Sequence, residues 1–577
     1  MTERPGRTWV ARGVLGATAL IILTTAVYAP AMRAGFIWDD DVWLWKDPYI
    51  RDGGGLLKYW VQPHPKAFDY LPLTSSAFWL QWRLWGMNPA GYHAVNIALH
   101  ATGALLLWGL LSRLKVPGAW LGALLFAIHP VNVASVAWIT ELKNTLSMPL
   151  ALAALLAYLR FETTRRRRWY VAGLALFALA LLSKSSVLVL PFVLLILIWW
   201  QRREVTRRDL LRSIPFFLLA AVVAVITIHF QHTRAIGVDV HGPQDLMQRF
   251  ALAGRAGWFY LYKAVWPARL SMIYPRWDIR AVTFVSFVPT LALLAVTATA
   301  VIYRKTFARP VAAALGCYWL GLLPVMGWVD MSFMLYSFVA DHWHYVALPA
   351  MAALAVGAVW RAVAKQRAGV RVAAAVAVTG IVTALSWQTF TQASVYRTEK
   401  DLWADTCRKN PDAWIAHNHL GTEFKKAGHF ARARNHYQQA IELNPRFAKA
   451  HNNLGNLCQD EGKWREAIGH HRRALGIKPN YANALNSLAI ALDHIHDNER
   501  AEQCYLQALS LEPTNVRAQF NLGLLYTKLG RHDEADKRFR TATELASDDR
   551  KLQDRIRRHM QAVRRNRESD PGGGYTP

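Results

Sequence analysis

Residues 448–481 read AKAHNNLGNLCQDEGKWREAIGHHRRALGIKPNY, and this stretch decides the fold of the C-terminal part of the chain. Its pattern recurs at steps of 34 residues. Four kinds of position keep this register: Pro411, Pro445, Pro479, Pro513; Leu420, Leu454, Leu488, Leu522; Gly421, Gly455, Ala489, Gly523; Ala440, Ala474, Ala508, Ala542. Such a period predicts one helix pair per repeat, stacked on the next pair, with proline ending the second helix.

This pattern resembles the tetratricopeptide repeat, and four repeats are expected over about 412–547, inside a domain at 396–549. A solenoid of such repeats has a concave groove that usually holds an extended protein segment. Asparagines are expected near this groove, either to contact a peptide backbone or to serve the packing: Asn418, Asn452, Asn486 and Asn521. Histidines of the repeats lack metal-ligand spacing and are expected at the surface: His417, His419, His451, His470 and His471. Residues 550–577 are expected to form a basic helix and a disordered tail.

The composition separates a membrane domain from the repeats. Hydrophobic residues make up 53% of the 577 residues, and they gather in apolar runs that precede the repeats. A polytopic, all-α membrane domain over 1–395 is therefore expected. The net charge of +28 lies largely in short loops between apolar runs, which is typical of a membrane protein and argues against nucleic-acid binding. The scattered cysteines argue against a disulfide framework and a zinc site: Cys317, Cys407, Cys458 and Cys504.

Eleven segments are expected to cross the membrane: residues 13–33, 92–112, 118–134, 143–160, 169–183, 186–200, 211–230, 283–303, 311–329, 344–362 and 372–390. Arg4, Arg7 and Arg12 precede the first segment, which predicts a cytoplasmic N-terminus. The odd number then places the repeats on the non-cytoplasmic side. Residues 1–31 also fit a signal peptide, but their long apolar stretch favours a retained anchor. Residues 250–268 are expected to be interfacial or re-entrant, because one more span would invert every later loop.

An acidic cluster directly follows the first apolar segment, where residues 36–43 read FIWDDDVW. Carboxylates at this place suit proton removal from a hydroxyl group or the binding of a divalent metal. A solvated acidic loop is an equally good interpretation of these residues taken alone. Asp41 and Asp47 extend the cluster, so spacing does not identify the functional pair.

Several further blocks, in this order and followed by tetratricopeptide repeats, resemble the GT-C membrane glycosyltransferases. The blocks are FIWDDD at 36–41, NPAGYHAVN at 88–96, HP at 129–130 with VAW at 136–138, LSKSS at 182–186, YK at 262–263, LP at 323–324 and AD at 340–341. The chain looks like a bacterial relative of the transmembrane and tetratricopeptide-repeat protein O-mannosyltransferases. The sequence departs from the family pattern after the HP block. There the family carries a basic and acidic pair, whereas this chain reads LKN at 142–144 and retains only Glu141 before it.

The resemblance implies transfer of a sugar from a polyprenyl-phosphate-linked donor to an acceptor hydroxyl, on the non-cytoplasmic side of a bacterial inner membrane. The acceptor would be a protein, and the repeats would recruit it or other partners. Two alternatives stay open: a membrane-anchored scaffold with an inactive membrane domain, or an enzyme that glycosylates lipid or polysaccharide. Eleven spans with polar residues on one side favour the enzyme over the scaffold.

Roles follow from what the reaction requires. Asp40 is the first candidate for the base that activates the acceptor, and Asp39 is the second. Candidates for binding the donor phosphate are Lys184, followed by Lys263, Arg255 and His342. Other candidate site residues are Glu141, Asp341, His93 and Asn96; the last two share a helical face with His100 and are expected mainly as buried hydrogen-bond partners. Asp39, Asp40 and Asp341 could also supply ligands to a divalent metal, although nothing in their spacing requires one.

Overall fold

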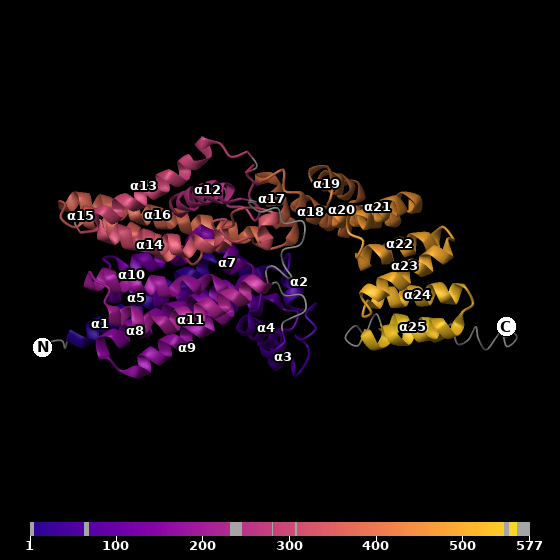
Figure 1. The fold of residues 1–577 in the computed structure, drawn as a ribbon, viewed down its shortest axis with the longest axis horizontal. Helices are drawn as coiled ribbons and strands as arrows, with labels where there is room; N and C mark the ends of the chain where they lie inside the picture. The colour runs from indigo at the N-terminus through magenta and orange to yellow at the C-terminus, as the bar shows by residue number, and fades with distance from the viewer. Residues whose placement is uncertain are drawn as a thin grey trace. The chain divides into compact units, whose positions relative to one another are not determined.

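The computed structural model describes residues 5–62, 69–230, 245–279, 281–305, 308–546 and 553–561. Within these ranges the chain forms helices and no strand, so the expected all-α class is confirmed (Figure 1). The chain divides into two compact units, Met1–Asn410 and Pro411–Pro577. The side chains of Arg4 and Arg7, the end of the expected basic helix from residue 562 onward, and the expected disordered tail at 570–577 lie outside the described residues.

Each of the eleven expected spans overlaps a helix of the first unit, in several cases only in part. These helices are α1 (Pro5–Val27), α5 (Pro89–Arg113), α6 (Ala119–Ala127), α8 (Leu142–Thr164), α9 (Arg167–Ser183), α10 (Leu190–Arg202), α11 (Arg207–Phe230), α13 (Val288–Ile302), α14 (Arg309–Leu322), α15 (Leu348–Val363) and α16 (Ala368–Val395). By length and composition, six helices of the described part can cross a membrane, or seven if a bent pair counts as one. The chain is therefore a multi-pass membrane protein, while the count of eleven and the orientation stay predictions.

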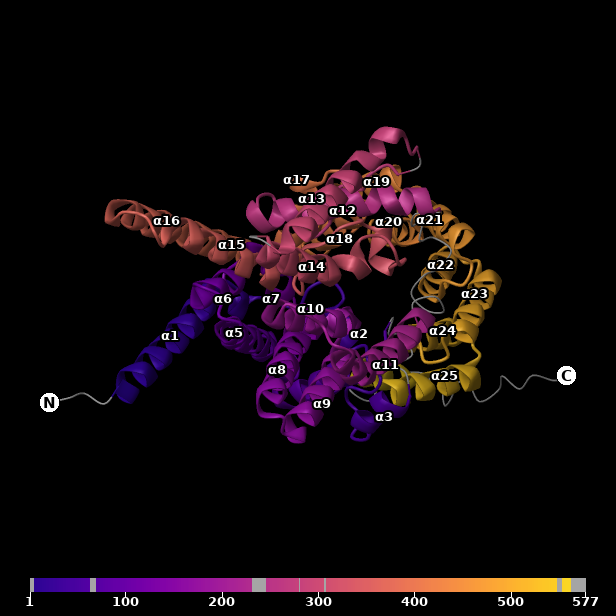
Figure 2. The same ribbon diagram turned by 60° about the vertical axis from the view of Figure 1, so that its left-hand side comes forward.

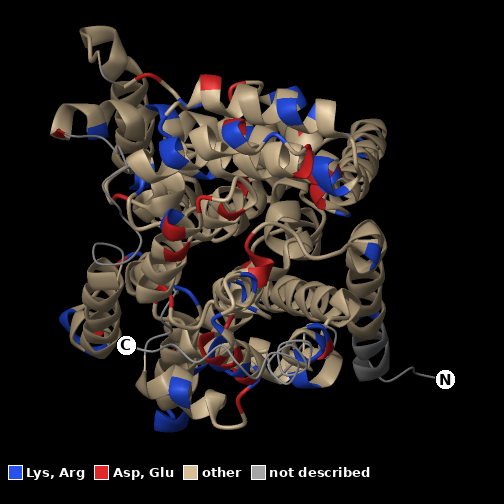
Figure 3. Cartoon of the chain, turned by 90° about the vertical axis from the view of Figure 1, so that its right-hand side faces the viewer, with Lys and Arg blue, Asp and Glu red and all other residues tan. Residues whose placement is uncertain are grey.

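The helices of this unit pack along one another. α8 lies against α5 and α9, α15 lies against α6 and α14, and α12 (Leu246–Val265) lies against α13. Figure 2 shows α16 extending away from its neighbours, and none of its most apolar window is buried. Figure 3 shows helical stretches that carry no Lys, Arg, Asp or Glu. α12 falls where an interfacial or re-entrant segment is expected, and it is absent from the six helices able to cross.

Short elements gather where the long helices begin or end, and they carry the candidate residues. They are α2 (Asp40–Trp43) after α1, η3 (Ile139–Glu141) before α8, η4 (Ser185–Val189) after α9, and η10 (Asp341–Trp343) before α15. α2 contacts η3, and η4 contacts α8. α7 (Val133–Ala137), which precedes η3 in the chain, contacts η10. Four segments that are distant in the sequence therefore meet in one region of the fold.

The second unit consists of the expected helix pairs, and their tetratricopeptide-like fold is confirmed. The pairs are α18 (Trp414–Lys426) with α19 (Phe430–Leu443), α20 (Ala448–Asp460) with α21 (Trp464–Ile477), α22 (Ala482–His494) with α23 (Asn498–Leu511), and α24 (Val516–Lys528) with α25 (His532–Leu545). Glycine permits the close approach within a pair: a Cβ at Gly421 would lie 2.9 Å from the ring of Tyr437.

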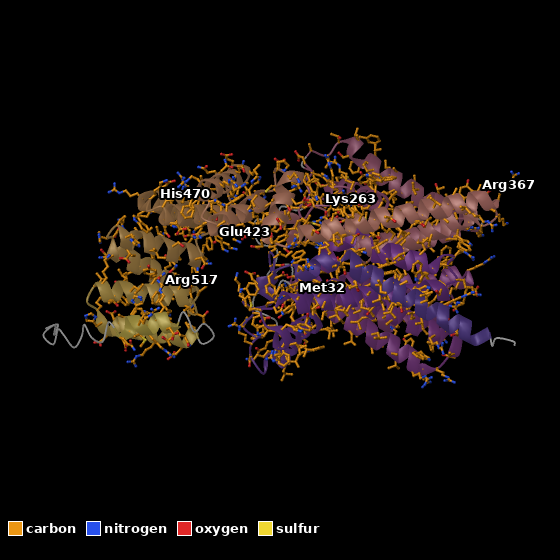
Figure 4. The ribbon with its side chains drawn as sticks, turned by 180° about the vertical axis from the view of Figure 1, so that it is seen from behind. Met32, Lys263, Arg367, Glu423, His470 and Arg517 are labelled. Carbon is orange, nitrogen blue, oxygen red and sulfur yellow. The ribbon has the colours of Figure 1, made fainter. Side chains whose placement is uncertain are left out.

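The expectation of surface histidines is wrong for three of the five, because His417, His451 and His471 are buried between paired helices. There they hydrogen-bond within their own repeat: His417 Nε2 lies 2.9 Å from the Pro411 carbonyl oxygen, and His471 Nδ1 lies 3.1 Å from Asn452 Oδ1. His470, labelled in Figure 4, is intermediate in exposure. His417 and His451, which are 34 residues apart, therefore occupy the same buried position in successive repeats.

Candidate active site

Asp40 is completely buried, and it ties the loop after α1 to the segment before α8. Its Oδ2 accepts a hydrogen bond from the Ile37 backbone N–H at 2.8 Å. Its Oδ1 accepts two more, from the Thr140 backbone N–H at 2.9 Å and from the Thr140 hydroxyl at 2.6 Å. Burial and the charge of Asp39 raise the pKa of Asp40, while these donors oppose that shift. Both oxygens are thus occupied by donors from the protein itself.

Asp39 stands at the N-cap of α2, and its Oδ1 is buried with no hydrogen-bond partner among the described residues. A buried carboxylate oxygen without a donor is costly in an ordinary fold and frequent at a reacting centre. Burial, together with the charge of Glu141, raises the pKa of Asp39 to about 6, whereas Lys143 opposes the shift. Of the two aspartates, Asp39 is therefore the one that keeps a carboxylate oxygen without a protein donor among the described residues.

Glu141, Lys143 and Lys184 form a buried charge cluster next to Asp39. The Lys143 Nζ lies 3.0 Å from Glu141 Oε1, and the Lys184 Nζ lies 3.1 Å from Glu141 Oε2. Asn144 Nδ2 donates to Glu141 Oε2 at 2.6 Å. The cluster is not isolated, because Asp39 acts electrostatically on Lys143 and Asp69 acts on both lysines. Two lysine ammonium groups side by side can stabilise an anion such as a phosphate group.

Aromatic rings enclose one side of this cluster. The ring of Trp38 stacks on the ring of Trp138 with centroids 5.3 Å apart and planes within 3°. The rings of Trp138 and His342 meet edge to face at 5.7 Å. Trp138 Nε1 is buried and has no hydrogen-bond partner among the described residues. In addition to Asp39 Oδ1, this indole N–H is a second buried polar group without a hydrogen-bond partner among the described residues.

Four of the sequence-predicted residues meet in this cluster: Asp39, Glu141, Lys184 and His342. The backbone oxygen of His342 accepts from Asn144 Nδ2 at 2.9 Å. Glu141 raises the pKa of His342, but burial outweighs it and lowers that pKa to about 3, so this ring is neutral. A neutral His342 does not supply the positive charge expected of a phosphate-binding residue.

Lys143 and Trp138 were missed as site residues by sequence reasoning. Lys143 lies in the LKN segment at 142–144, where the sequence departs from the family block, so the resemblance assigns it no role. A usable signal was present, because a lysine at the start of an apolar segment is costly unless it is paired or functional. Trp138 is part of the VAW block, but nothing in the sequence distinguishes its indole N–H group from those of the other tryptophans.

Lys263, Asp341 and Arg255 lie in other surroundings. Asp341 accepts a hydrogen bond from the Tyr274 hydroxyl at 2.8 Å, and burial raises its pKa to about 7. Lys263, labelled in Figure 4, lies 5.2 Å from the Tyr274 ring centroid and donates to the Ala268 carbonyl. Arg255 donates to the Asp278 carbonyl oxygen at 3.3 Å. Each of these three side chains already has a partner within residues 268–278.

Polar side chains of α5 form hydrogen bonds to segments that carry site residues. Asn96 Nδ2 donates to the Trp138 carbonyl oxygen at 3.2 Å, and Asn96 Oδ1 accepts from the Thr145 hydroxyl at 3.1 Å. His100 Nδ1 lies 2.7 Å from the Tyr345 hydroxyl. His93 is fully buried on the same face of α5. Asn96 thus fixes the backbone on which Trp138 stands.

An apolar cavity of about 730 Å³ lies between α5, α8, α10, α14 and α15. Val187 and Val346 line it, and each follows a site residue closely in the chain, namely Lys184 and His342. Lys115 and Arg361 are the charged residues of its lining, and both stand at or beyond C-terminal helix ends. The cavity therefore offers an apolar channel whose lining adjoins two site segments.

A metal site was left open by the sequence. Within the described ranges, the one group of His, Cys, Asp and Glu side chains close enough to share an ion is Cys458, Glu466 and His470, in the repeat unit. Arg434 donates to Glu466 at 2.7 Å and contacts Cys458 Sγ at 3.6 Å, which opposes a bound cation there. Asp39, Asp40 and Asp341 are not part of that group, and Asp341 accepts a hydrogen bond from Tyr274.

Comparison with known families supports two assignments. The sequence model of the dolichyl-phosphate-mannose-protein mannosyltransferase family matches residues 64–230. The model of the middle TPR-like domain of cilia and flagella-associated protein 70 matches residues 417–546. The first match covers the charge cluster and the lysine of the LSKSS block, and the second covers the repeats.

Curated relatives include a protein O-mannosyl-transferase of Caenorhabditis elegans, 28% identical over 162 residues, or 26% of this chain and 24% of the relative. Another, of Mus musculus, is 32% identical over 195 residues, or 30% of this chain and 21% of the relative. The chain thus spans about a quarter or less of the length of these relatives.

Solved structures show a local likeness that covers about a quarter of the chain. A crystal structure of MamA is 24% identical and covers 26% of this chain and 89% of its own, with a TM-score of 0.24. YrrB, described as a TPR protein with an unusual peptide-binding site, is 20% identical and covers 26% of this chain and 79% of its own, with a TM-score of 0.24. The family-model and relative matches support the resemblance drawn from the sequence blocks: the chain is similar to the protein O-mannosyltransferases and carries a tetratricopeptide-like domain, while a bacterial origin stays a prediction.

Proposed function

We propose that this protein is a membrane glycosyltransferase that moves a sugar, mannose by analogy with its relatives, from a polyprenyl-phosphate-linked donor to a hydroxyl group of a protein. The observation that carries the proposal is the pairing of a base with an anion site. Asp39 has a buried oxygen without a partner, and it interacts electrostatically with Lys143 and Glu141. Lys143 and Lys184 both contact Glu141. Removal of a proton and stabilisation of a departing phosphate are the two tasks of such a transfer.

The proposed reaction uses these groups as follows. Asp39 accepts the proton of the acceptor hydroxyl, and the acceptor oxygen forms a bond to the anomeric carbon of the sugar. The bond between that carbon and the donor phosphate oxygen breaks, and its electron pair leaves with the phosphate. Lys143 and Lys184 stabilise the negative charge that develops there. Trp138 contributes its unused N–H as a hydrogen-bond donor to the substrate.

Asp39 rather than Asp40 is proposed as the base, which reverses the order expected from the sequence. Asp40 accepts three hydrogen bonds from Ile37 and Thr140, and a carboxylate engaged in this way is a poor proton acceptor for a substrate. Its proposed role is to hold the loop before α2 against the segment before α8.

The apolar cavity is proposed to take the lipid chain of the donor. Its lining is almost entirely apolar, and Val187 lies three residues after Lys184, so the chain would enter next to the phosphate-binding lysines. The repeats are proposed to bind the acceptor or a partner through an extended segment. Some asparagines expected near the groove form hydrogen bonds between repeats: Asn418 accepts from Asn453 at 2.9 Å, and Asn486 accepts from Asn521 at 3.1 Å. These asparagines therefore serve the packing of the repeats.

The decisive experiment uses the full chain in liposomes with a radiolabelled polyprenyl-phosphate mannose and a mixture of unglycosylated envelope proteins. Wild-type protein is expected to label protein. Asp39→Asn is expected to lower the rate by about 10²–10⁴-fold with unchanged thermal stability, because it removes the base without altering the shape. Asp41→Asn is the matched control, since Asp41 pairs with Lys46.

Three outcomes would contradict the proposal in different ways. Equal rates for wild type and Asp39→Asn would exclude Asp39 as the base. Label found in lipid or polysaccharide alone would identify another acceptor. An unlabelled reaction at every donor tested, combined with a cellular defect on loss of the repeats, would favour the scaffold.

The proposed location is a bacterial inner membrane, with the N-terminus in the cytoplasm and the repeats on the other side. A reporter that is active only outside the cytoplasm, fused after residue 395, is expected to be active. An inactive fusion would overturn both the orientation and the count of eleven spans.

A further inference from the structure

Trp38, the residue before the proposed base, has an unusual backbone conformation. Its φ is 46°, in the left-handed region, which is strained for a bulky residue. Such strain persists only where the surroundings hold it, and it concentrates at functional sites. The backbone N–H of Trp38 donates a hydrogen bond to Glu399 Oε1 at 3.0 Å, across 361 residues of sequence. The strained residue is therefore held by a side chain from far along the chain.

Glu399 is the first residue of α17 (Glu399–Lys409), which follows the last expected span and precedes the first repeat. The same helix also holds the ring of Trp38. Trp403 is completely buried, and its ring lies 5.2 Å from the ring of Trp38 at 67°. The ring of Trp138 stacks on Trp38. Backbone and ring of Trp38 are thus both fixed by α17.

The end of α17 holds a second segment near the site. Lys409 Nζ donates to the Leu270 carbonyl oxygen at 2.6 Å, and Asn410 Nδ2 donates to the Ile273 carbonyl oxygen at 3.3 Å. The next residue, Tyr274, donates to Asp341, the neighbour of His342. α17 therefore contacts the segment that carries Asp39 and a second segment that contacts the candidate residue Asp341, although α17 lies outside the apolar helices.

We infer that Glu399 is a positioning residue for the proposed transfer. It holds Trp38 in the left-handed conformation, and this sets the direction in which the carboxylate of Asp39 points. Without its carboxylate oxygen the strain is released, the peptide between residues 38 and 39 rotates, and Asp39 moves from the acceptor. The inference rests on the proposed function for its catalytic part, whereas its structural part can be measured without turnover.

The test compares three variants of the full chain. Glu399→Ala removes the acceptor oxygen, Glu399→Gln keeps an acceptor oxygen of the same reach, and Asp401→Asn changes a charge on the same helical turn at an exposed hydrogen bond to Thr398. Hydrogen exchange of the peptide that covers residues 36–41 is measured first. Glu399→Ala is expected to speed it at least about tenfold, because a bond to a charged acceptor is lost. Glu399→Gln and Asp401→Asn are expected to exchange like wild type.

Transfer kinetics then separate positioning from loss of folding. For Glu399→Ala we expect kcat to fall at least about tenfold while KM for the donor stays unchanged, because misplacing a catalytic group affects the chemical step. Glu399→Gln is expected to restore most of the rate. Wild-type exchange in Glu399→Ala would overturn the inference, and so would changed exchange with wild-type kcat. A wild-type protein that transfers no sugar would instead overturn the proposed function and leave the exchange result standing.

Discussion

The repeat unit and the membrane unit hold their side chains together over very different lengths of sequence. In the repeats, contacts follow the period: Asn453 bonds Asn418 and Asn521 bonds Asn486, both across 35 residues. In the membrane unit the decisive contacts have no common spacing. Asp40 and Thr140 are 100 residues apart, and Trp38 and Glu399 are 361 apart. A period can be recognised from sequence alone, whereas a site assembled from unrelated distances cannot.

The largest effect is expected where charges are buried in the membrane unit. Glu141→Ala would leave Lys143 and Lys184 without their shared carboxylate, and breaking a buried pair costs about 3–5 kcal/mol. Thermal unfolding of the full chain, followed by exchange in α8, is expected to show this loss. Glu162→Ala, which removes an ion-paired carboxylate at the other end of α8, is the control and is expected to cost less. Equal losses would mean that the cluster is no special feature of the site.

A second comparison concerns the two neighbouring aspartates. In Asp40→Asn, the side-chain NH₂ group would face one of the backbone N–H groups, of Ile37 or Thr140, that now donate to Asp40. This loss is expected to lower the free energy of unfolding by roughly 1–3 kcal/mol. Asp39→Asn is expected to leave the free energy of unfolding unchanged and to lower the rate of transfer by about 10²–10⁴-fold. Measuring the free energy of unfolding and the transfer rate in both variants distinguishes a structural aspartate from the catalytic base. A stable Asp40→Asn variant that has lost transfer would return Asp40 to the role of base.

In the repeat unit the sharpest test is a single methyl group. Gly421→Ala would bring a Cβ within 2.9 Å of Tyr437, and overpacking of this kind typically costs about 1–3 kcal/mol. Gly469→Ala, in α21, meets open space and is expected to stabilise its helix by up to about 1 kcal/mol. Unfolding of the repeats followed by circular dichroism compares the two. Opposite signs would confirm that the glycine serves the packing between paired helices.

The smallest effect is expected from pH. Because burial raises the pKa of Asp39 to about 6, the fraction of ionised base falls as the pH drops through that value. The rate kcat/KM for transfer is expected to fall about tenfold per pH unit below 6 and to level off above it. A pH profile that is flat between pH 5 and 7 would show that Asp39 does not carry the proton.

The sequence was sufficient for the helices and for part of the site. Apolar runs and the 34-residue period located every expected span and repeat on a helix, because both signals are local. Asp39, Glu141, Lys184 and His342 were named in advance and do meet. The partners that decide their roles were not, because Thr140, Lys143 and Glu399 act through contacts that no periodicity encodes. Buried repeat histidines were misplaced because a polar residue can pack inside a helix pair when it finds a carbonyl or amide partner.

The charge cluster at the start of α8 also has a consequence for biogenesis. During synthesis Glu141 and Lys143 leave the ribosome well before Lys184, which lies 43 residues after Glu141. Until α9 is made, these charges must stay at the water interface, since a charged residue at the bilayer centre costs about 2.5–3.5 kcal/mol. The translocon is therefore expected to release α8 and α9 into lipid as one hairpin, and the site would begin to assemble before the remaining spans exist.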